Sequence, residues 1–422
     1  MIAQSPCNPA ARPVLWHPLV LLIAGLVTWP SEWEGLRTVL DSARSPEHSS
    51  IDHEPHALGY YIELIEGSSG YHAARPEGWV DFRKADVIRY LDNDFLLFEL
   101  KPNLCRTVFD GLPFRTNSFG MHGDPASLEK PSGTFRIAVL GASMDMGWGV
   151  RYEETYTHRL QEWLDSRADT DGRKARRYEV LNFAVAAYSP LQRLETLRRK
   201  VMDFQPDLVV YSATTLDIRL MEIHLCDMLR LHVDLKYDFV REAVGRTGIG
   251  PADLRVDRSG ELIDKQALKD KLRSCYWGLY DRTLGEIAAE CRAAGVPLAM
   301  VIIPRAGSKD APTRRAEPVA RLRALAAHHA IRTFDLSDTF DHDNPATLEV
   351  AAGDDHPNAT GHGRLFEAIA RSLAADPTLA PLVLSAGPSS RREGLGPREP
   401  VGPPDSPVVG TNRPSPDLGD SG

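Results

Sequence analysis

Short apolar runs alternate with amphipathic stretches from residue 135 onward. The apolar runs cover residues 136–141, 178–185, 207–213, 297–304 and 331–336. They are rich in β-branched residues and nearly continuous, which is typical of strands buried on both faces. Helical periodicity occupies residues 153–167, 191–204, 220–244, 276–294, 316–330 and 359–374. This alternation predicts an α/β domain with a doubly wound, parallel sheet of about five strands.

The segments on either side of this pattern differ from it. Residues 45–134 carry short apolar runs broken by turn residues, with a strand expected over 95–103, and predict a small, partly β N-terminal extension. From residue 386 the chain is rich in Pro, Gly and Ser and lacks apolar periodicity, which predicts a disordered tail. The predicted organisation is therefore a leading segment (1–44), the extension (45–134), the α/β domain (135–385) and the tail (386–422).

An almost uncharged run over residues 14–29 lies in the leading segment. It is shorter than the roughly 20 residues that a spanning helix needs, and it contains His17 and Pro18. Arg12 before it and Glu32 after it favour an orientation with the N-terminal side in the cytoplasm. An uncleaved signal anchor, a signal peptide and a buried helix are all compatible with this pattern. We expect a cell-envelope protein, anchored or secreted, with a cytoplasmic one as the alternative.

Composition narrows the functional class. The net charge of -9 argues against a protein whose main role is to coat nucleic acid. The five cysteines form neither a CxxC motif nor a Cys/His cluster with zinc spacing. We therefore expect neither a nucleic-acid partner nor a structural zinc site.

Two positions at predicted strand ends could carry catalysis. Ser143 follows the first strand at a strand-to-helix turn, where it could be a nucleophile or merely cap the next helix. His356 follows the last strand with Asp354 two residues before it, the arrangement of a general base and its orienting carboxylate. Because parallel strands end at one edge of a sheet, these residues could meet there. Serine, histidine and aspartate together suit nucleophilic acyl transfer.

These motifs resemble the SGNH hydrolase (GDSL esterase/lipase) superfamily over about residues 135–374. The family's first block is matched by Gly141, Ser143 and Gly147, and its last by residues 354–362 (DDHPNATGH). The arginine-asparagine-x-x-glycine signature of large bacterial members with an N-terminal extension is matched within residues 115–123 (RTNSFGMHG). The resemblance implies a flavodoxin-like, three-layer α/β/α fold. It also implies ester hydrolysis by Ser143, His356 and Asp354, with no metal or organic cofactor.

The chain departs from the family pattern around the expected oxyanion hole. The resemblance assigns this role to the amides of Ser143 and Ala187, where Ala187 replaces a usual glycine. Leu216 stands where the family has an asparagine, so the hydroxyl of Thr214 or of Thr215 would replace that side chain as a donor, and we assign the role to Thr215. Ala142 replaces the aspartate of the first block. Loss of one oxyanion donor costs about a hundred- to a thousandfold in rate.

Three functions are compatible with these residues: an esterase acting on a small-molecule or polysaccharide ester, an acyltransferase of the same chemistry, and a degenerate, binding-only module. The predicted helix over 220–244 is an inserted packing helix or, alternatively, a lid over the site.

Overall fold

The computed structural model describes residues 85–384, apart from 109–110, 169–175, 307–311 and 352–353. The predictions for the apolar segment 14–29, for residues 45–84 and for the tail from residue 386 lie outside this range. In the part of the chain that is described, no helix is long and apolar enough to cross a membrane.

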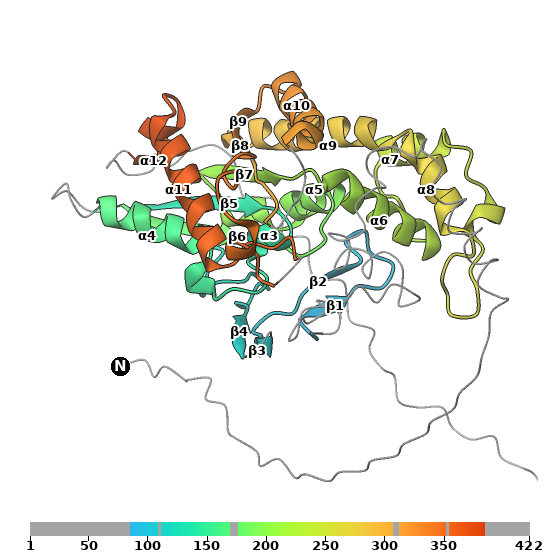
Figure 1. The fold of residues 1–422 in the computed structure, drawn as a ribbon, viewed down its shortest axis with the longest axis horizontal. Helices are drawn as coiled ribbons and strands as arrows, with labels where there is room; N and C mark the ends of the chain where they lie inside the picture. The colour runs from blue at the N-terminus through green and yellow to red at the C-terminus, as the bar shows by residue number, and fades with distance from the viewer. Residues whose placement is uncertain (1–84, 109–110, 169–175, 307–311, 352–353, 385–422) are drawn as a thin grey trace, which may run out of the picture. The chain divides into compact units, whose positions relative to one another are not determined.

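A five-stranded parallel sheet forms the centre of the fold (Figure 1). Its strands are β5 (Thr134–Leu140), β6 (Arg177–Asn182), β7 (Leu208–Ala213), β8 (Leu298–Ile302) and β9 (Arg332–Asp335). They lie side by side in the order β6-β5-β7-β8-β9, and every neighbouring pair is parallel. In chain order this is 2-1-3-4-5, the flavodoxin-like arrangement. The predicted fold class is confirmed.

Helices cover both faces because the side chains of each strand alternate between two cores. Ile137 and Val139 pack with α4 (Tyr156–Ala168), α11 (Ala359–Ala375) and α12 (Leu379–Leu384). Ala138 and Leu140 pack on the opposite face with α5 (Pro190–Arg199), α9 (Tyr276–Ala293) and α10 (Pro312–His328). The period of two along each strand thus produces the three layers.

One predicted helix is interrupted. In place of a continuous helix over 220–244 the structure has α6 (Asp217–Arg230) and α7 (Asp238–Gly245). Between them, His232 and Lys236 adopt left-handed backbone conformations, and the Asp234 carboxylate accepts the Lys236 amide in a local turn. The chain continues through a short 3-10 turn (Pro251–Leu254) to α8 (Lys265–Arg273). Most side chains of α6 are buried, which agrees with a packing helix.

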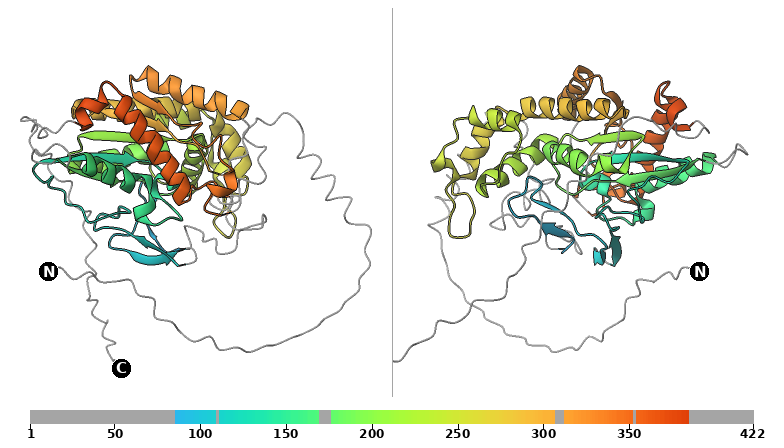
Figure 2. Two further views of the ribbon diagram at one scale, coloured as in Figure 1. Left: turned by 60° about the vertical axis from the view of Figure 1, so that its left-hand side comes forward. Right: turned by 180° about the vertical axis from the view of Figure 1, so that it is seen from behind.

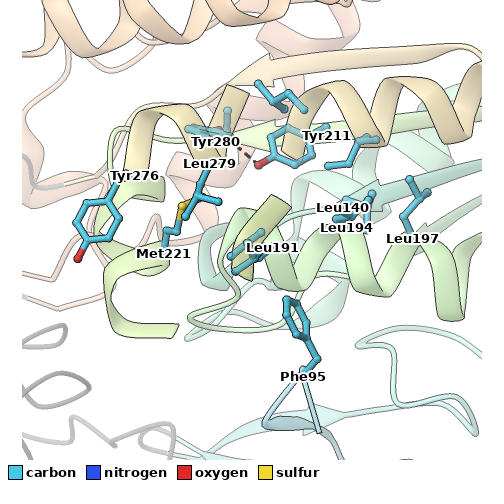
Figure 3. Packing of buried hydrophobic residues seen from close by; sticks show 14 of the residues in the cluster. Phe95, Leu140, Leu191, Leu194, Leu197, Tyr211, Met221, Tyr276, Leu279 and Tyr280 are labelled. Carbon is cyan, nitrogen blue, oxygen red and sulfur yellow. Dashed lines mark hydrogen bonds between the residues drawn. The ribbon is translucent and has the colours of Figure 1, made fainter. Parts of the chain in front are cut away.

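The described part of the extension consists of two antiparallel pairs, which lie together on one side of the domain in Figures 1 and 2. β1 (Ile88–Tyr90) pairs with β2 (Phe98–Leu100), and β3 (Cys105–Val108) pairs with β4 (Leu112–Arg115). Phe95 points from this extension toward Leu191 of α5 (Figure 3). The Tyr188 hydroxyl donates to the Phe98 carbonyl at 2.6 Å, so the extension and the α/β unit are joined by apolar and polar contacts.

Candidate active site

Ser143 lies three residues beyond the end of β5, as the first residue of the short helix α3 (Ser143–Met146). Ala142, not Ser143, is the N-cap residue, so helix capping does not explain the serine. Ser143 is 1% exposed. The turn is tight: a Cβ on Gly141 would lie 2.1 Å from Asp145 Oδ2, so this position requires glycine. Gly147 then ends the helix in a left-handed conformation.

Asp145 holds this turn, a role that the sequence interpretation missed. Its Oδ2 accepts the Ala142 amide at 2.9 Å, and its Oδ1 accepts the Tyr156 hydroxyl at 2.8 Å. The Asn182 side chain, at the end of β6, donates to the Asp145 carbonyl at 2.7 Å. Burial raises the pKa of Asp145, while hydrogen bonds from Ser212, Ala142 and Tyr156 oppose that effect. A buried carboxylate thus occurs in this turn although Ala142 replaces the family's aspartate.

The predicted pair of His356 and Asp354 is in direct contact. The Nδ1 of His356 lies 2.5 Å from Asp354 Oδ1, which also accepts the His356 backbone amide at 2.8 Å. Both side chains are buried. Nδ1 therefore faces the carboxylate, which fixes the ring and leaves Nε2 as the nitrogen directed elsewhere.

Neighbouring residues hold the histidine loop in place. Asn358 caps α11 by accepting the amides of Thr360 and Gly361, and its own amide donates to the carbonyls of Thr347 and Glu349. Asp355 is ion-paired with Arg305, which follows β8, at 3.1 Å. Asp355 is thus engaged with Arg305, whereas Asp354 contacts the imidazole.

The loops after β6 and β7 contain the predicted oxyanion residues. Ala187 adopts a left-handed conformation with φ of 63°, so it keeps the backbone shape that usually favours glycine. After β7, the Thr214 hydroxyl accepts the Leu216 amide at 3.1 Å and donates to Asp217 at 3.4 Å, so it serves the start of α6. Thr215 lines a cavity of about 230 Å³ together with residues of the loops after β8 and β9, including Arg305 and Leu348.

These loops converge on one apolar cluster. Ala142, next to Ser143, belongs to the same buried cluster as Ala187, and Leu216 and Val350 pack against it. A Cβ on Gly149 would lie 2.5 Å from Val350, so the end of the nucleophile turn directly abuts the loop that carries His356. Four loops at the carboxyl edge of the sheet thus share one packing unit.

The N-terminal extension contributes to this cluster through Phe114 and its neighbours. His122, from the motif over 115–123, stacks on Phe114 at 4.4 Å between ring centroids, and its Nδ1 lies 2.7 Å from the Met146 carbonyl of α3. In the same motif Gly120 has a positive φ, and a Cβ there would lie 2.7 Å from the Leu100 carbonyl oxygen. Residues 115–123 therefore form a turn that packs against α3, the helix that begins at Ser143.

Comparisons with known proteins find similarity among solved structures. No family model matches the chain, and no curated protein matches it. A structure of TesA is 16% identical with a TM-score of 0.36, covering 56% of this chain and 97% of that chain. The esterase EstA from Pseudoalteromonas sp., inhibited by monoethylphosphonate, is 13% identical with a TM-score of 0.33, covering 56% of this chain and 98% of that chain. A lipase/acylhydrolase from Enterococcus faecalis is 14% identical with a TM-score of 0.34, covering 57% of this chain and 95% of that chain.

The strand order of the sheet is the flavodoxin-like one that the resemblance of the motifs to SGNH hydrolases implies.

Proposed function

We propose that this protein is a serine ester hydrolase with Ser143 as nucleophile, His356 as general base and Asp354 as the group that orients the imidazole. The observation that carries the proposal is the hydrogen bond between His356 Nδ1 and Asp354, on a loop at the carboxyl edge of the sheet. Ser143 follows β5 at that same edge. Serine, histidine and aspartate in these roles perform acyl transfer on many unrelated folds.

In the proposed reaction, the Ser143 hydroxyl attacks the carbonyl carbon of an ester while His356 Nε2 accepts the hydroxyl proton. The protonated imidazole, stabilised by Asp354, then gives that proton to the departing alcohol, and an acyl-serine remains. A water molecule then attacks the acyl-serine in the same way, with His356 again accepting and returning the proton. This step releases the carboxylic acid and restores Ser143. The amides of Ser143 and Ala187 and the hydroxyl of Thr215 are the proposed donors to the carbonyl oxygen.

Covalent labelling of the full chain by a fluorophosphonate tests this proposal. We expect labelling of the wild type and its loss in Ser143→Ala. Ser189→Ala is a matched control, because the Ser189 hydroxyl also contacts a buried histidine, His224, at 2.9 Å. Mass analysis of the labelled peptide identifies the serine. A folded wild-type protein that takes no label, or a label on Ser189, would contradict the proposal and favour a binding-only role.

The proposed substrates are carboxylic esters, of small molecules or of acetylated polysaccharides. Comparing p-nitrophenyl acetate with longer acyl esters measures the acyl preference, and adding an acceptor alcohol separates hydrolysis from acyl transfer. We also propose that residues 14–29 direct the chain to the cell envelope. Cell fractionation of the full chain and of a variant lacking these residues tests that location.

A further inference from the structure

Three side chains with metal-binding atoms converge far from the candidate active site. Asp281 lies on α9, His328 is the last residue of α10 and His329 follows it. The ligand atoms of all three lie within 4.8 Å of one another. His328 Nδ1 is 3.0 Å and His329 Nε2 is 2.8 Å from the same oxygen, Asp281 Oδ1. From these contacts we propose that Asp281, His328 and His329 bind a divalent transition-metal ion such as Zn²⁺.

The convergence of the two histidines is not an ordinary product of helix geometry. Consecutive residues on a helix do not face each other. Here the chain leaves α10 at His328, and Ala330 adopts a left-handed conformation with φ of 56°. The two rings come to lie with their centroids 4.5 Å apart. Two imidazole nitrogens therefore face the same carboxylate oxygen of Asp281.

Helix α9 carries a glycine where the His329 ring packs against it. Gly285 lies one turn after Asp281 on α9, and a Cβ there would lie 2.8 Å from His329 Cε1. A larger residue at this position would therefore displace the His329 ring from its place. The Arg292 guanidinium, further along α9, donates to the His329 carbonyl at 3.4 Å and so helps to hold this residue. His329 is therefore held from two sides by α9.

The dimensions and the donor set suit zinc. Ligand atoms bound to one Zn²⁺ at about 2.0–2.2 Å lie roughly 3–3.5 Å apart, so small side-chain shifts would admit the ion. Imidazole and carboxylate are both ordinary zinc ligands. The His328 side chain is 66% exposed, which leaves space for water to complete the coordination.

The site's place in the fold indicates a structural role. α10 leads into β9, so its C-terminal end lies at the amino edge of the sheet, opposite the edge that carries Ser143 and His356. α9 and α10 pack against each other (Figure 1). A bound ion would connect these two helices, and it would stabilise the folded state by an amount that rises with the logarithm of the free-ion concentration once that concentration exceeds the dissociation constant.

Calorimetric titration of the chelator-treated full chain with Zn²⁺ tests the inference. We expect wild type to bind Zn²⁺ and to melt at a higher temperature when it is bound. His328→Ala and Asp281→Ala should each weaken binding at the site by at least about tenfold. His342→Ala, which removes another exposed histidine, should bind like wild type. His329→Ala serves as a second variant on the more buried side of the cluster.

Two outcomes would overturn the inference: no Zn²⁺ binding by wild type, or binding that is equal in wild type and in His328→Ala, Asp281→Ala and His329→Ala. Fluorophosphonate labelling of Ser143 should be unchanged in His328→Ala, because the two sites lie at opposite edges of the sheet. The inference therefore succeeds or fails independently of the proposed esterase activity.

Discussion

At the scale of single residues, the turn that carries Ser143 depends on the carboxylate of Asp145, which is not one of the proposed catalytic residues. Asp145 joins the backbone before Ser143 to Tyr156 and Asn182, which lie on different elements. Each of these donors is buried, and two of them, the Ala142 amide and the Tyr156 hydroxyl, donate to the Asp145 carboxylate. Asp145 is therefore a positioning residue for Ser143.

Asp145→Asn should lower the stability of the fold by about 1–3 kcal/mol, because an amide can replace only one of the two carboxylate acceptors. It should also slow fluorophosphonate labelling of Ser143 by about tenfold or more at temperatures where the variant is folded. Urea denaturation and the labelling rate measure the two effects. Tyr156→Phe removes one donor only and should give a smaller effect on both. Labelling at the wild-type rate in folded Asp145→Asn would show that the turn does not need this carboxylate.

At the scale of elements, buried histidines join segments that are far apart in the chain. Nε2 of His224 on α6 donates to the Phe95 carbonyl, and its Nδ1 accepts the Ser189 hydroxyl. His122 donates to the Met146 carbonyl, and His362 accepts the Tyr156 amide. Burial lowers the pKa of His122 and His224 to about 4 and that of His362 to about 3. All three histidines are therefore neutral in the folded protein near neutral pH.

This neutrality predicts a loss of stability in acid. The unfolded chain binds protons at these histidines below about pH 6.5, whereas the folded chain resists protonation until about pH 4 at His122 and His224 and about pH 3 at His362. The stabilisation is complete above about pH 6.5 and declines as the pH falls, by up to about 1.4 kcal/mol per pH unit for each histidine. Urea denaturation of wild type and His224→Gln at about pH 7 and about pH 5 measures the slope. The free energy of unfolding should change less with pH in His224→Gln than in wild type. In His342→Gln, which replaces an exposed histidine, it should change as much as in wild type. Equal pH dependence in His224→Gln and wild type would refute this account.

The elements and the catalytic candidates could be predicted from sequence to different degrees. The strands were recognisable because burial on both faces makes continuous apolar runs, and Ser143 and His356 stood out because they follow such runs. The break between α6 and α7 was not recognisable, because the amphipathic pattern continues through it and the interruption depends on backbone conformations at His232 and Lys236. The positioning role of Asp145 could not be predicted, because its hydrogen-bond partners come from separate elements and form no local sequence pattern.

At the scale of the molecule, the N-terminal extension and the α/β unit share their packing. Phe114 of the extension belongs to the same buried cluster as Ala142 and Ala187 beside the candidate site. The Gln192 side chain of α5 donates to the Leu96 carbonyl at 2.6 Å. Elements that share buried apolar surface in this way unfold together. The extension should therefore have no folding transition of its own.

Paired core substitutions test this cooperativity. Phe114→Ala in the extension should cost about 3–5 kcal/mol, and Leu365→Ala on α11 about 2–5 kcal/mol, because both side chains are buried and leave cavities. Both variants should move one and the same urea transition, followed by circular dichroism and by tryptophan fluorescence. Leu128→Ala, in an exposed position before β5, should change stability by less than about 0.5 kcal/mol. A separate early transition that Phe114→Ala shifts and Leu365→Ala leaves in place would instead show that the extension folds independently of the α/β unit.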